Sequence, residues 1–492
     1  MNYIIKRKKY LILFIFLVII TWLLFTSFFD NRIDKEKIIN SHNVQRNLVT
    51  NISINGVLGS YDKDNGIFYF SADSFVFKNV KIISPYKVKY YIKKNDDKHY
   101  NIFVYSSDYY YQYEICLVSI PLVNIYTFDI FDVEKCDTEF NECPIGITIN
   151  DNKNNGINGS YNVLNSYGML RVRGRTSRHF AKKSYKVSVD KKASVLGLTS
   201  DNDWVLDSLY SDPSKVRNKL SSDIWNLIND NQTIDNDLGV EFVEVFIDNV
   251  YKGLYTIKNN VDKHVTSLND TGLLIKAINH FNYDHVYLLK NKNFPIDEDG
   301  LFLNMEVKRY NSYLFDVFLD KMYNYYTEND IFDTFDNDNF LNYKILVALM
   351  SGDDNVTKNI YFSINHSDDH ILITPWDMDM TWGLIYDSAS PIFSSKLMEN
   401  YNDEFRMECD VTYNLDDDSL RKVKQRYWEL RKNVINMEII NSYLDEYKYL
   451  LINSGASRRD SGKWYDYDVE FEIEEIRSWI KKRIDYLDNY FK

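Results

Sequence analysis

Cysteine and proline are both scarce in this chain of 492 residues, which has four cysteines and seven prolines. The cysteines form no CxxC pair and have no histidine at a ligand spacing, which argues against a structural zinc site. So few prolines argue against long proline-rich linkers. Cys136 and Cys143 enclose a short segment, and the sequence leaves open whether they form a disulfide or stay as buried thiols.

Positive charge is also in deficit, because 58 Lys and Arg residues stand against 71 Asp and Glu residues, for a net charge of −13. This balance opposes general binding to nucleic-acid phosphates and favours a basic partner. Apolar residues, in contrast, make up 45% of the chain and aromatic residues 16%. A chain of this length and composition builds large cores, which excludes a wholly disordered or collagen-like protein.

A single long apolar run lies near the N-terminus. Residues 10–29 are almost uninterruptedly apolar, and as a helix they are long enough to cross a hydrocarbon layer of about 30 Å. Basic residues at positions 6–9 precede the run and no small-residue cleavage site follows it, so we expect an uncleaved signal anchor. A cleaved signal peptide is the alternative. The basic flank predicts that residues 1–9 are cytoplasmic and that the main domains are extracytoplasmic.

The rest of the chain divides into a stalk and two folded regions. We expect residues 30–51 to form a polar stalk. Residues 52–140 contain short aromatic and β-branched runs between turn-forming residues, which predicts a small sandwich-like β-rich domain. From 144 to 492, strand-like and helical segments mix, with a predicted helix over 339–350 and an amphipathic helix at the C-terminus. The predicted fold class of this last domain is therefore α+β.

The stretch from residue 351 to 383 contains two groups of polar residues on either side of a predicted hairpin. The runs IYFSI and HILIT read as its arms, so Asp377 and Asp379 return to the loop with Asp354 and Asn359. Asp354 precedes Asn359 by five positions, as the catalytic Asp precedes a metal-binding Asn in protein kinases, and a metal-binding Asp then follows a hairpin. Such oxygen ligands hold Mg²⁺. Taken singly, each of these residues is more often a solvated turn residue.

Positive charge gathers in one segment, residues 170–189, of an otherwise acidic chain. The segment contains Arg173, and Gly174 gives its loop the freedom for a close backbone approach to a ligand. Strand periodicity favours Lys183 as the lysine that reaches a semi-buried polyphosphate, with Lys186 as the solvated alternative. A basic surface that balances the acidic chain is the competing interpretation.

Several short motifs together resemble the spore coat protein H, or CotH, kinase family over roughly residues 144–492. They occur in family order: VRG at 172–174, AKKSY at 181–185, DWVL at 203–206, SDPS at 211–214, RN at 217–218, VEVF at 243–246, GLY at 253–255, the loop from Asp354 to Asn359, and PWDMD at 375–379. After GLY, family members often have a glutamate, whereas this chain has Asn259 with Asp262 nearby.

The resemblance implies an atypical protein-kinase-like domain that uses ATP with Mg²⁺, or with Mn²⁺, to phosphorylate Ser or Thr residues. The implied substrate is a Ser-rich, basic coat or surface protein, and the implied location is the cell envelope or spore surface. The resemblance also assigns roles to residues. The catalytic base is Asp354, the metal ligands are Asn359, Asp377 and Asp379, and the nucleotide contacts are Lys183, Arg173 and Gly174.

The leading hypothesis is therefore a membrane-anchored kinase, and two other functions stay open. Because ATP is scarce outside cells, a non-catalytic CotH-like surface adhesin or assembly scaffold is the main alternative. A metal-assisted hydrolase that uses Asp377 and Asp379 is the other. Neither nucleic-acid binding nor any particular oligomeric state is predicted.

Overall fold

The computed structural model describes most of the chain after its first 34 residues. The described residues are 35, 37–72, 77, 79–128, 133, 136, 141–151, 162–174, 177–229, 238–279, 300–328, 331–384 and 415–492. The predicted anchor, residues 10–29, lies outside them. Within these ranges, no helix has both the length and the apolar character needed to cross a membrane.

The chain forms two compact units, and the first, Met1–Val118 with Asn155–Ser160, is β-rich as expected. One sheet has the order β4-β5-β9-β8-β7, with β1 also paired to β9, and a smaller sheet has the order β3-β2-β6. Apolar side chains such as Phe68, Ile102 and Ile115 are fully buried in this unit. The strands are β1 (Asn43–Val44), β2 (Asn51–Ile54), β3 (Val57–Leu58), β4 (Ser60–Asp62), β5 (Ile67–Ser71), β6 (Val80–Ile83), β7 (Lys89–Lys94), β8 (His99–Tyr105) and β9 (Tyr109–Val118).

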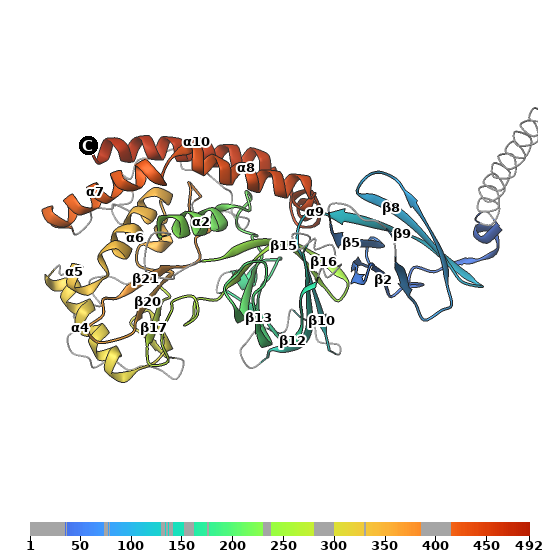
Figure 1. The fold of residues 1–492 in the computed structure, drawn as a ribbon, viewed down its shortest axis with the longest axis horizontal. Helices are drawn as coiled ribbons and strands as arrows, with labels where there is room; N and C mark the ends of the chain where they lie inside the picture. Colours follow the sequence, from blue (N-terminus) through green and yellow to red (C-terminus); the bar gives the residue numbers. More distant parts are fainter. Residues whose placement is uncertain are drawn as a thin grey trace, which may run out of the picture. The chain divides into compact units, whose positions relative to one another are not determined.

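The second unit, Ser119–Asn154 with Tyr161–Lys492, begins with a closed seven-stranded barrel in the order β10-β11-β12-β13-β14-β16-β15 (Figure 1). β10 pairs with both β11 and β15, so it closes the barrel and is not part of the preceding β-rich unit. Alternate residues of each strand, such as Tyr185 and Val187, fill the barrel core. The strands are β10 (Leu122–Thr127), β11 (Cys143–Asn150), β12 (Asn162–Arg173), β13 (Ser184–Ala193), β14 (Asp201–Asp207), β15 (Val240–Ile247) and β16 (Val250–Asn259).

Cys136 and Cys143 form a disulfide next to the start of β11. The structure thereby decides between the two states that the sequence left open. Disulfides persist mainly in oxidising compartments, so this bond bears on where the protein works.

A second sheet follows the barrel in the order β18-β19-β17-β20-β21. β20 and β21 pair antiparallel, which confirms the predicted hairpin. The helix predicted over 339–350 is also confirmed: Asp336 caps its start and Ser351, with φ of 50°, ends it. The elements are β17 (Leu273–Ala277), β18 (Leu301–Phe302), β19 (Met305–Arg309), β20 (Ile360–Ile364), β21 (Leu372–Pro375), α6 (Asn337–Met350) and the 3₁₀ turn η3 (Asp353–Asn355).

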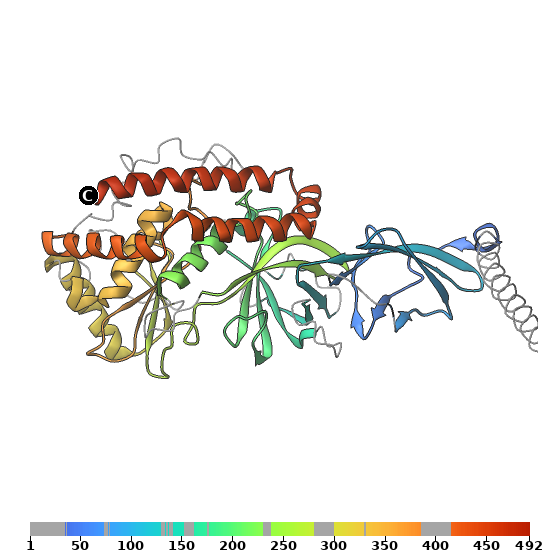
Figure 2. The same ribbon diagram turned by 45° about the horizontal axis from the view of Figure 1, so that its top comes forward.

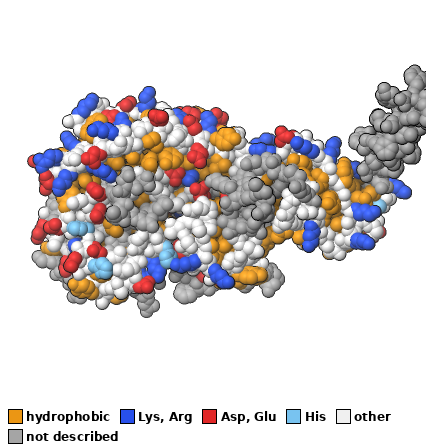
Figure 3. All heavy atoms as spheres, in the orientation of Figure 1, with side chains coloured by type: hydrophobic (Ala, Val, Ile, Leu, Met, Phe, Trp, Pro, Cys, Tyr) orange, Lys and Arg blue, Asp and Glu red, His pale blue; other side chains and the backbone are white. Residues whose placement is uncertain are grey.

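Helices α7, α8 and α10 form a layer beside α2 and α6 (Figures 1 and 2). The C-terminal helix α10 buries the apolar stripe that the sequence predicted, including Ile473, Ile480 and Leu487. Charged side chains of both signs are interspersed over this layer (Figure 3). The remaining elements are η2 (Ser177–His179), α2 (Arg217–Asn229), α4 (Ser312–Glu328), α5 (Ile331–Thr334), α7 (Asp417–Asn433), α8 (Met437–Asn453), α9 (Ala456–Lys463) and α10 (Val469–Tyr490).

Candidate active site

The β20–β21 hairpin brings the two predicted groups of polar residues together. The backbone N–H of Trp376 donates to the carbonyl of Asn359 at 2.9 Å, so the next residue, Asp377, lies beside Asn359. The side chain of Asn355 donates to the carbonyl of Trp376 at 2.8 Å and fixes the turn that contains Asp354 to the same strand end. Asn359 and Asp377 both have φ of 55°. Such left-handed backbone in residues other than glycine is often found at functional sites.

Asp379 lies deep in the second unit, although part of its side chain remains accessible to solvent. Its Oδ2 accepts a hydrogen bond from Ser211 Oγ at 2.9 Å. Burial and the neighbouring carboxylates of Asp377 and Asp207 raise the pKa of Asp379 to about 8. We call Asp207, Asp377 and Asp379 the carboxylate cluster. Because like charges oppose each other's ionisation, the cluster favours either a shared proton or a bound cation.

Three cationic side chains lie next to the carboxylate cluster. Lys258 Nζ is 3.0 Å from Asp207 Oδ2. The charged groups of Lys258, Arg173 and Lys276 lie 4.6, 5.4 and 5.6 Å from the ring centre of Trp376. Burial, followed by the charge of Arg173, lowers the pKa of Lys276 to about 8. These three residues, which we call the cation group, provide charge-assisted donors for a polyphosphate.

The predicted base, Asp354, lies in the 3₁₀ turn that follows α6. Its Oδ2 is 2.8 Å from Lys358 Nζ, and the two side chains are 34% and 28% exposed. A carboxylate that is accessible in this way can accept a proton from an incoming hydroxyl. Lys358 places a positive charge beside the Asp354 carboxylate.

The three predicted nucleotide contacts, Arg173, Gly174 and Lys183, have different surroundings in the structure. Arg173 belongs to the cation group. Gly174 has φ of 104°, and a Cβ there would lie 1.8 Å from Ser177 Oγ, so this turn requires glycine. Lys183 Nζ instead donates to the carbonyl of Arg178 at 2.8 Å. A phosphate contact by Lys183 remains a prediction, and Lys258 is a second candidate for that role.

Sequence reasoning missed Asp207, Lys258 and Lys276. Lys276 is the one charged residue of β17 (LLIKA), a signal that could have been noticed because charged residues are seldom buried without a partner. Asp207 and Lys258 belong to strands that contain other charged residues, so they carried no such signal. Asn259, where the family often has glutamate, points elsewhere: its side-chain N–H donates to the carbonyl of Thr199 at 2.9 Å. Lys258, one position earlier, is the residue of this strand that reaches the cluster.

A buried ion pair between Arg217 and Asp212 lies next to Ser211 in the chain. Arg217 Nη1 lies 2.5 Å from Asp212 Oδ1, and Arg217 Nε donates to the carbonyl of Thr381 at 3.1 Å. The pair therefore ties the SDPS turn to the residues that follow Asp379. In this chain, Arg217 thus contacts both the SDPS turn and the segment after PWDMD.

A family model described as CotH kinase protein matches residues 170–487. The chain belongs to this family. Among solved structures, this CotH protein is similar to "a Helicobacter pylori proinflammatory kinase CtkA", with 10% identity and a TM-score of 0.28. That match covers 61% of this chain and 89% of the other, and at this TM-score it says nothing about the site. No curated protein matches the chain.

The donor set of this CotH domain fits a hard divalent cation. Asp377 and Asp379 offer carboxylate oxygens and Asn359 offers an amide oxygen, which are ligand types that Mg²⁺ and Mn²⁺ accept. Among the described residues, the side chains of Asp377 and Asn359 make no hydrogen bond or ion pair. These three residues would hold the ion.

Cation binding at this site is expected to depend on pH. Because the pKa of Asp379 is about 8, the proton on this carboxyl must leave when a cation binds. The affinity for Mn²⁺ should therefore rise by about tenfold per pH unit from pH 6 to 8 and level off above pH 8. Calorimetric titration in buffers of different ionisation enthalpy measures the released proton. Asp379→Asn should remove the pH dependence, and a flat profile for the parent protein would contradict this assignment.

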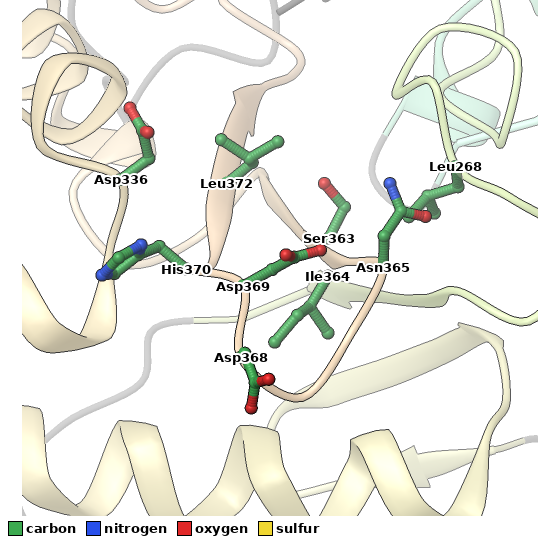
Figure 4. A pocket seen from close by; sticks show the side chains of 9 residues that line it. All are labelled: Leu268, Asp336, Ser363, Ile364, Asn365, Asp368, Asp369, His370 and Leu372. Atoms are coloured by element: carbon green, nitrogen blue, oxygen red, sulfur yellow. The ribbon is translucent and has the colours of Figure 1, made fainter.

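A cavity of about 290 Å³ lies at the opposite end of the hairpin. The turn around residues 365–370 lines the cavity. The active-site residues follow the other end of β21, so the cavity is not part of the active site. Its lining residues are Leu268, Asp336, Ser363, Ile364, Asn365, Asp368, Asp369, His370 and Leu372 (Figure 4).

Proposed function

We propose that this CotH protein is a kinase that transfers the γ-phosphate of ATP to Ser or Thr residues of a coat or surface protein. The observation that carries the proposal is the meeting of Asp354, Asn359 and Asp377 at one strand end, beside the cation group. Family membership supports the same reaction class.

In the proposed reaction, Asp354 accepts the proton of the substrate hydroxyl as its oxygen forms a bond to the γ-phosphorus. The bond from that phosphorus to the bridging oxygen breaks, and ADP leaves with the bonding electrons. Lys358 holds the Asp354 carboxylate in place. A bound divalent cation would offset the charge of the phosphates, and Asn359, Asp377 and Asp379 would hold it.

The cation group would orient the phosphates, with Arg173 and Lys258 contributed by the barrel and Lys276 by the second sheet. Lys258 is fixed by Asp207, and Asp207 is itself held by Ser184 Oγ at 3.3 Å and by Asn218 Nδ2 at 3.3 Å. A donor whose position is fixed before the substrate arrives costs less ordering entropy when it binds. The barrel thus supplies preorganised positive charge.

We also propose that the substrate is Ser-rich and basic, and that the main domains are anchored outside the cytoplasm by residues 10–29. The net charge of −13 supports a basic substrate. The Cys136–Cys143 disulfide supports an oxidising compartment.

Incubation of the purified chain with labelled ATP, Mg²⁺ or Mn²⁺ and a Ser/Lys-rich peptide tests the proposal. The expected result is label on serine, together with saturable ATP binding. An ATP-free hydrolysis product would instead indicate the hydrolase. Absence of both nucleotide binding and label transfer would leave the scaffold function.

Lys258→Met is expected to lower kcat/KM for ATP by about 100-fold, because it removes a charge-assisted phosphate donor. Lys183→Met should change the same constant by less than about threefold, because Lys183 points to the Arg178 carbonyl. Steady-state kinetics at varied ATP measures both. The reverse order of effects would assign the phosphate contact to Lys183.

A further inference from the structure

A second group of metal-binding residue types lies outside the active site. Asp201 is the first residue of β14, whereas Asp262 and His264 belong to the segment 260–272 between β16 and β17. One donor atom of each side chain lies within 4.8 Å of the other two. We call these three residues the Asp-Asp-His group.

Asp201 is the member of the group that most requires a cation. The residue is fully buried, and its Oδ1 accepts the N–H of Asn202 at 2.7 Å. Among the described residues, its Oδ2 is buried with no hydrogen-bond partner. A buried carboxylate oxygen without a partner is costly, and a metal ion is one of the few ways to stabilise it.

One carboxylate oxygen of Asp262 accepts backbone hydrogen bonds, and the other is available to a ligand. Its Oδ1 accepts the N–H groups of His264 at 2.7 Å and Val265 at 3.4 Å, which fixes the turn from 262 to 266. Within the described chain, its Oδ2 makes no hydrogen bond or ion pair. Asp262 is only partly buried, so an ion can enter from solvent on this side.

The side chain of His264 contacts an exposed lysine. Lys192 Nζ lies 2.6 Å from His264 Nε2. The ammonium therefore lies against the ring nitrogen that could otherwise bind an ion. The exposed Lys192 also places a positive charge beside this member of the Asp-Asp-His group. A divalent ion would supply that charge more effectively.

The Asp-Asp-His group is separate from the active-site cation. Asp201 and Asp207 lie at opposite ends of β14, and six residues at about 3.3 Å each place their Cα atoms roughly 20 Å apart. One ion cannot bind at both ends of this strand.

We propose that Asp201, Asp262 and His264 form a second divalent-cation site with a preference for Zn²⁺. Two carboxylates with one imidazole suit Zn²⁺ better than Mg²⁺ or Ca²⁺, which prefer oxygen ligands alone. Bonds of about 2.1 Å to one ion require the donor atoms to approach within roughly 3.5 Å. Rotation of the partly exposed Asp262 and His264 side chains provides this movement.

The bound ion joins β14 of the barrel to the segment that leads into the second sheet. It thereby restrains the segment that connects the barrel to the second sheet. The active site contains residues from both. This role does not depend on phosphotransfer, so it can be tested in a protein with a disabled active site.

The test uses the full chain, free of affinity tags, with Asp377→Asn and Asp379→Asn to remove the active-site ligands. Competition with a chromophoric chelator should reveal one tight Zn²⁺ site per chain. Adding Asp201→Asn or His264→Gln should weaken that site by at least 100-fold, whereas the exposed Asp190→Asn on β13 should not. Zn²⁺ should also raise the melting temperature of this doubly substituted parent protein. It should not raise that of the proteins that also carry Asp201→Asn or His264→Gln.

Lys192→Ala gives a test that removes no ligand. Because the ammonium competes with the ion, its loss should tighten Zn²⁺ binding several-fold. The proposal is overturned if the parent binds no Zn²⁺, if Asp201→Asn and His264→Gln bind it as tightly as the parent, or if Lys192→Ala weakens binding. His264→Gln and Lys192→Ala are partly or fully exposed changes, so the test remains decisive even if Asp201→Asn fails to fold.

Discussion

Asp377→Asn is expected to lower phosphotransfer by about 10³-fold or more while leaving the protein folded. A lost cation ligand removes several kcal/mol of transition-state stabilisation, and each 1.4 kcal/mol is about tenfold in rate. The substitution keeps the size of the side chain, and Asp377 makes no hydrogen bond or ion pair among the described residues whose loss would unfold the protein. The measurement is label transfer to the Ser/Lys-rich peptide at saturating ATP.

The matched control is Asp368→Asn, an exposed aspartate in the turn at the other end of the same hairpin. It should leave the rate unchanged. Circular dichroism and the melting temperature of both variants should equal those of the parent. Equal activity of Asp377→Asn and Asp368→Asn would refute the kinase assignment and leave a scaffold that uses the CotH fold without its chemistry.

Asp460→Ala is expected to destabilise the second unit by about 3–5 kcal/mol, because it leaves buried ammonium groups without their partner. Asp460 is fully buried in α9, and its Oδ1 lies 2.6 Å from Lys182 Nζ and accepts the N–H of Leu254 at 2.9 Å. Its Oδ2 lies 3.9 Å from Lys215 Nζ. Burial lowers the pKa of Lys215 to about 7 even with this carboxylate nearby. The measurement is the melting temperature, together with hydrogen exchange in α9 and β16.

Exposed Asp466→Ala serves as the control and should cost less than about 0.5 kcal/mol. The double variant Lys182→Met, Asp460→Leu should recover much of the loss, since replacing both partners leaves fewer unpaired charges. A small effect of Asp460→Ala alone would show that α9 does not depend on this ion pair for its attachment to the barrel.

The same ion pair explains the GLY motif. Gly253 has φ of 113°, and a Cβ at this position would lie 2.2 Å from Asp460 Oδ1. A glycine is needed here because the carboxylate of a helix about 200 residues later approaches the strand so closely. Sequence comparison identified the motif, but only the folded chain gives its physical cause.

Local features were predictable because they depend on neighbours in the chain. The helix ending near Ser351 and the β20–β21 hairpin follow from apolar periodicity and turn residues. The hairpin in turn implied that Asp377 returns beside Asn359, and the backbone hydrogen bond from Trp376 to Asn359 confirms it. The spacing of Asp354, Asn359 and Asp377 could thus be interpreted without knowledge of the rest of the fold.

The positions of the lysines were not predictable in the same way. Lys182 and Lys183 are neighbours, yet one is fully buried against Asp460 and the other contacts an exposed carbonyl. Both lysines precede β13, which begins at Ser184, so strand alternation does not decide which of them points inward. Lys258 was overlooked because nothing near it in the chain marks a ligand site.

The sequence by itself determined the α+β class, the hairpin and the acidic residues at its end, because each depends on short-range patterns. Closure of the barrel and packing of the second sheet decided which cations meet those acids. Residues 173, 207, 258 and 276 come from four different strands, and their charges are brought together only by long-range pairing. Asp201 and His264 are likewise joined only by the tertiary fold, since 63 positions separate them in the chain.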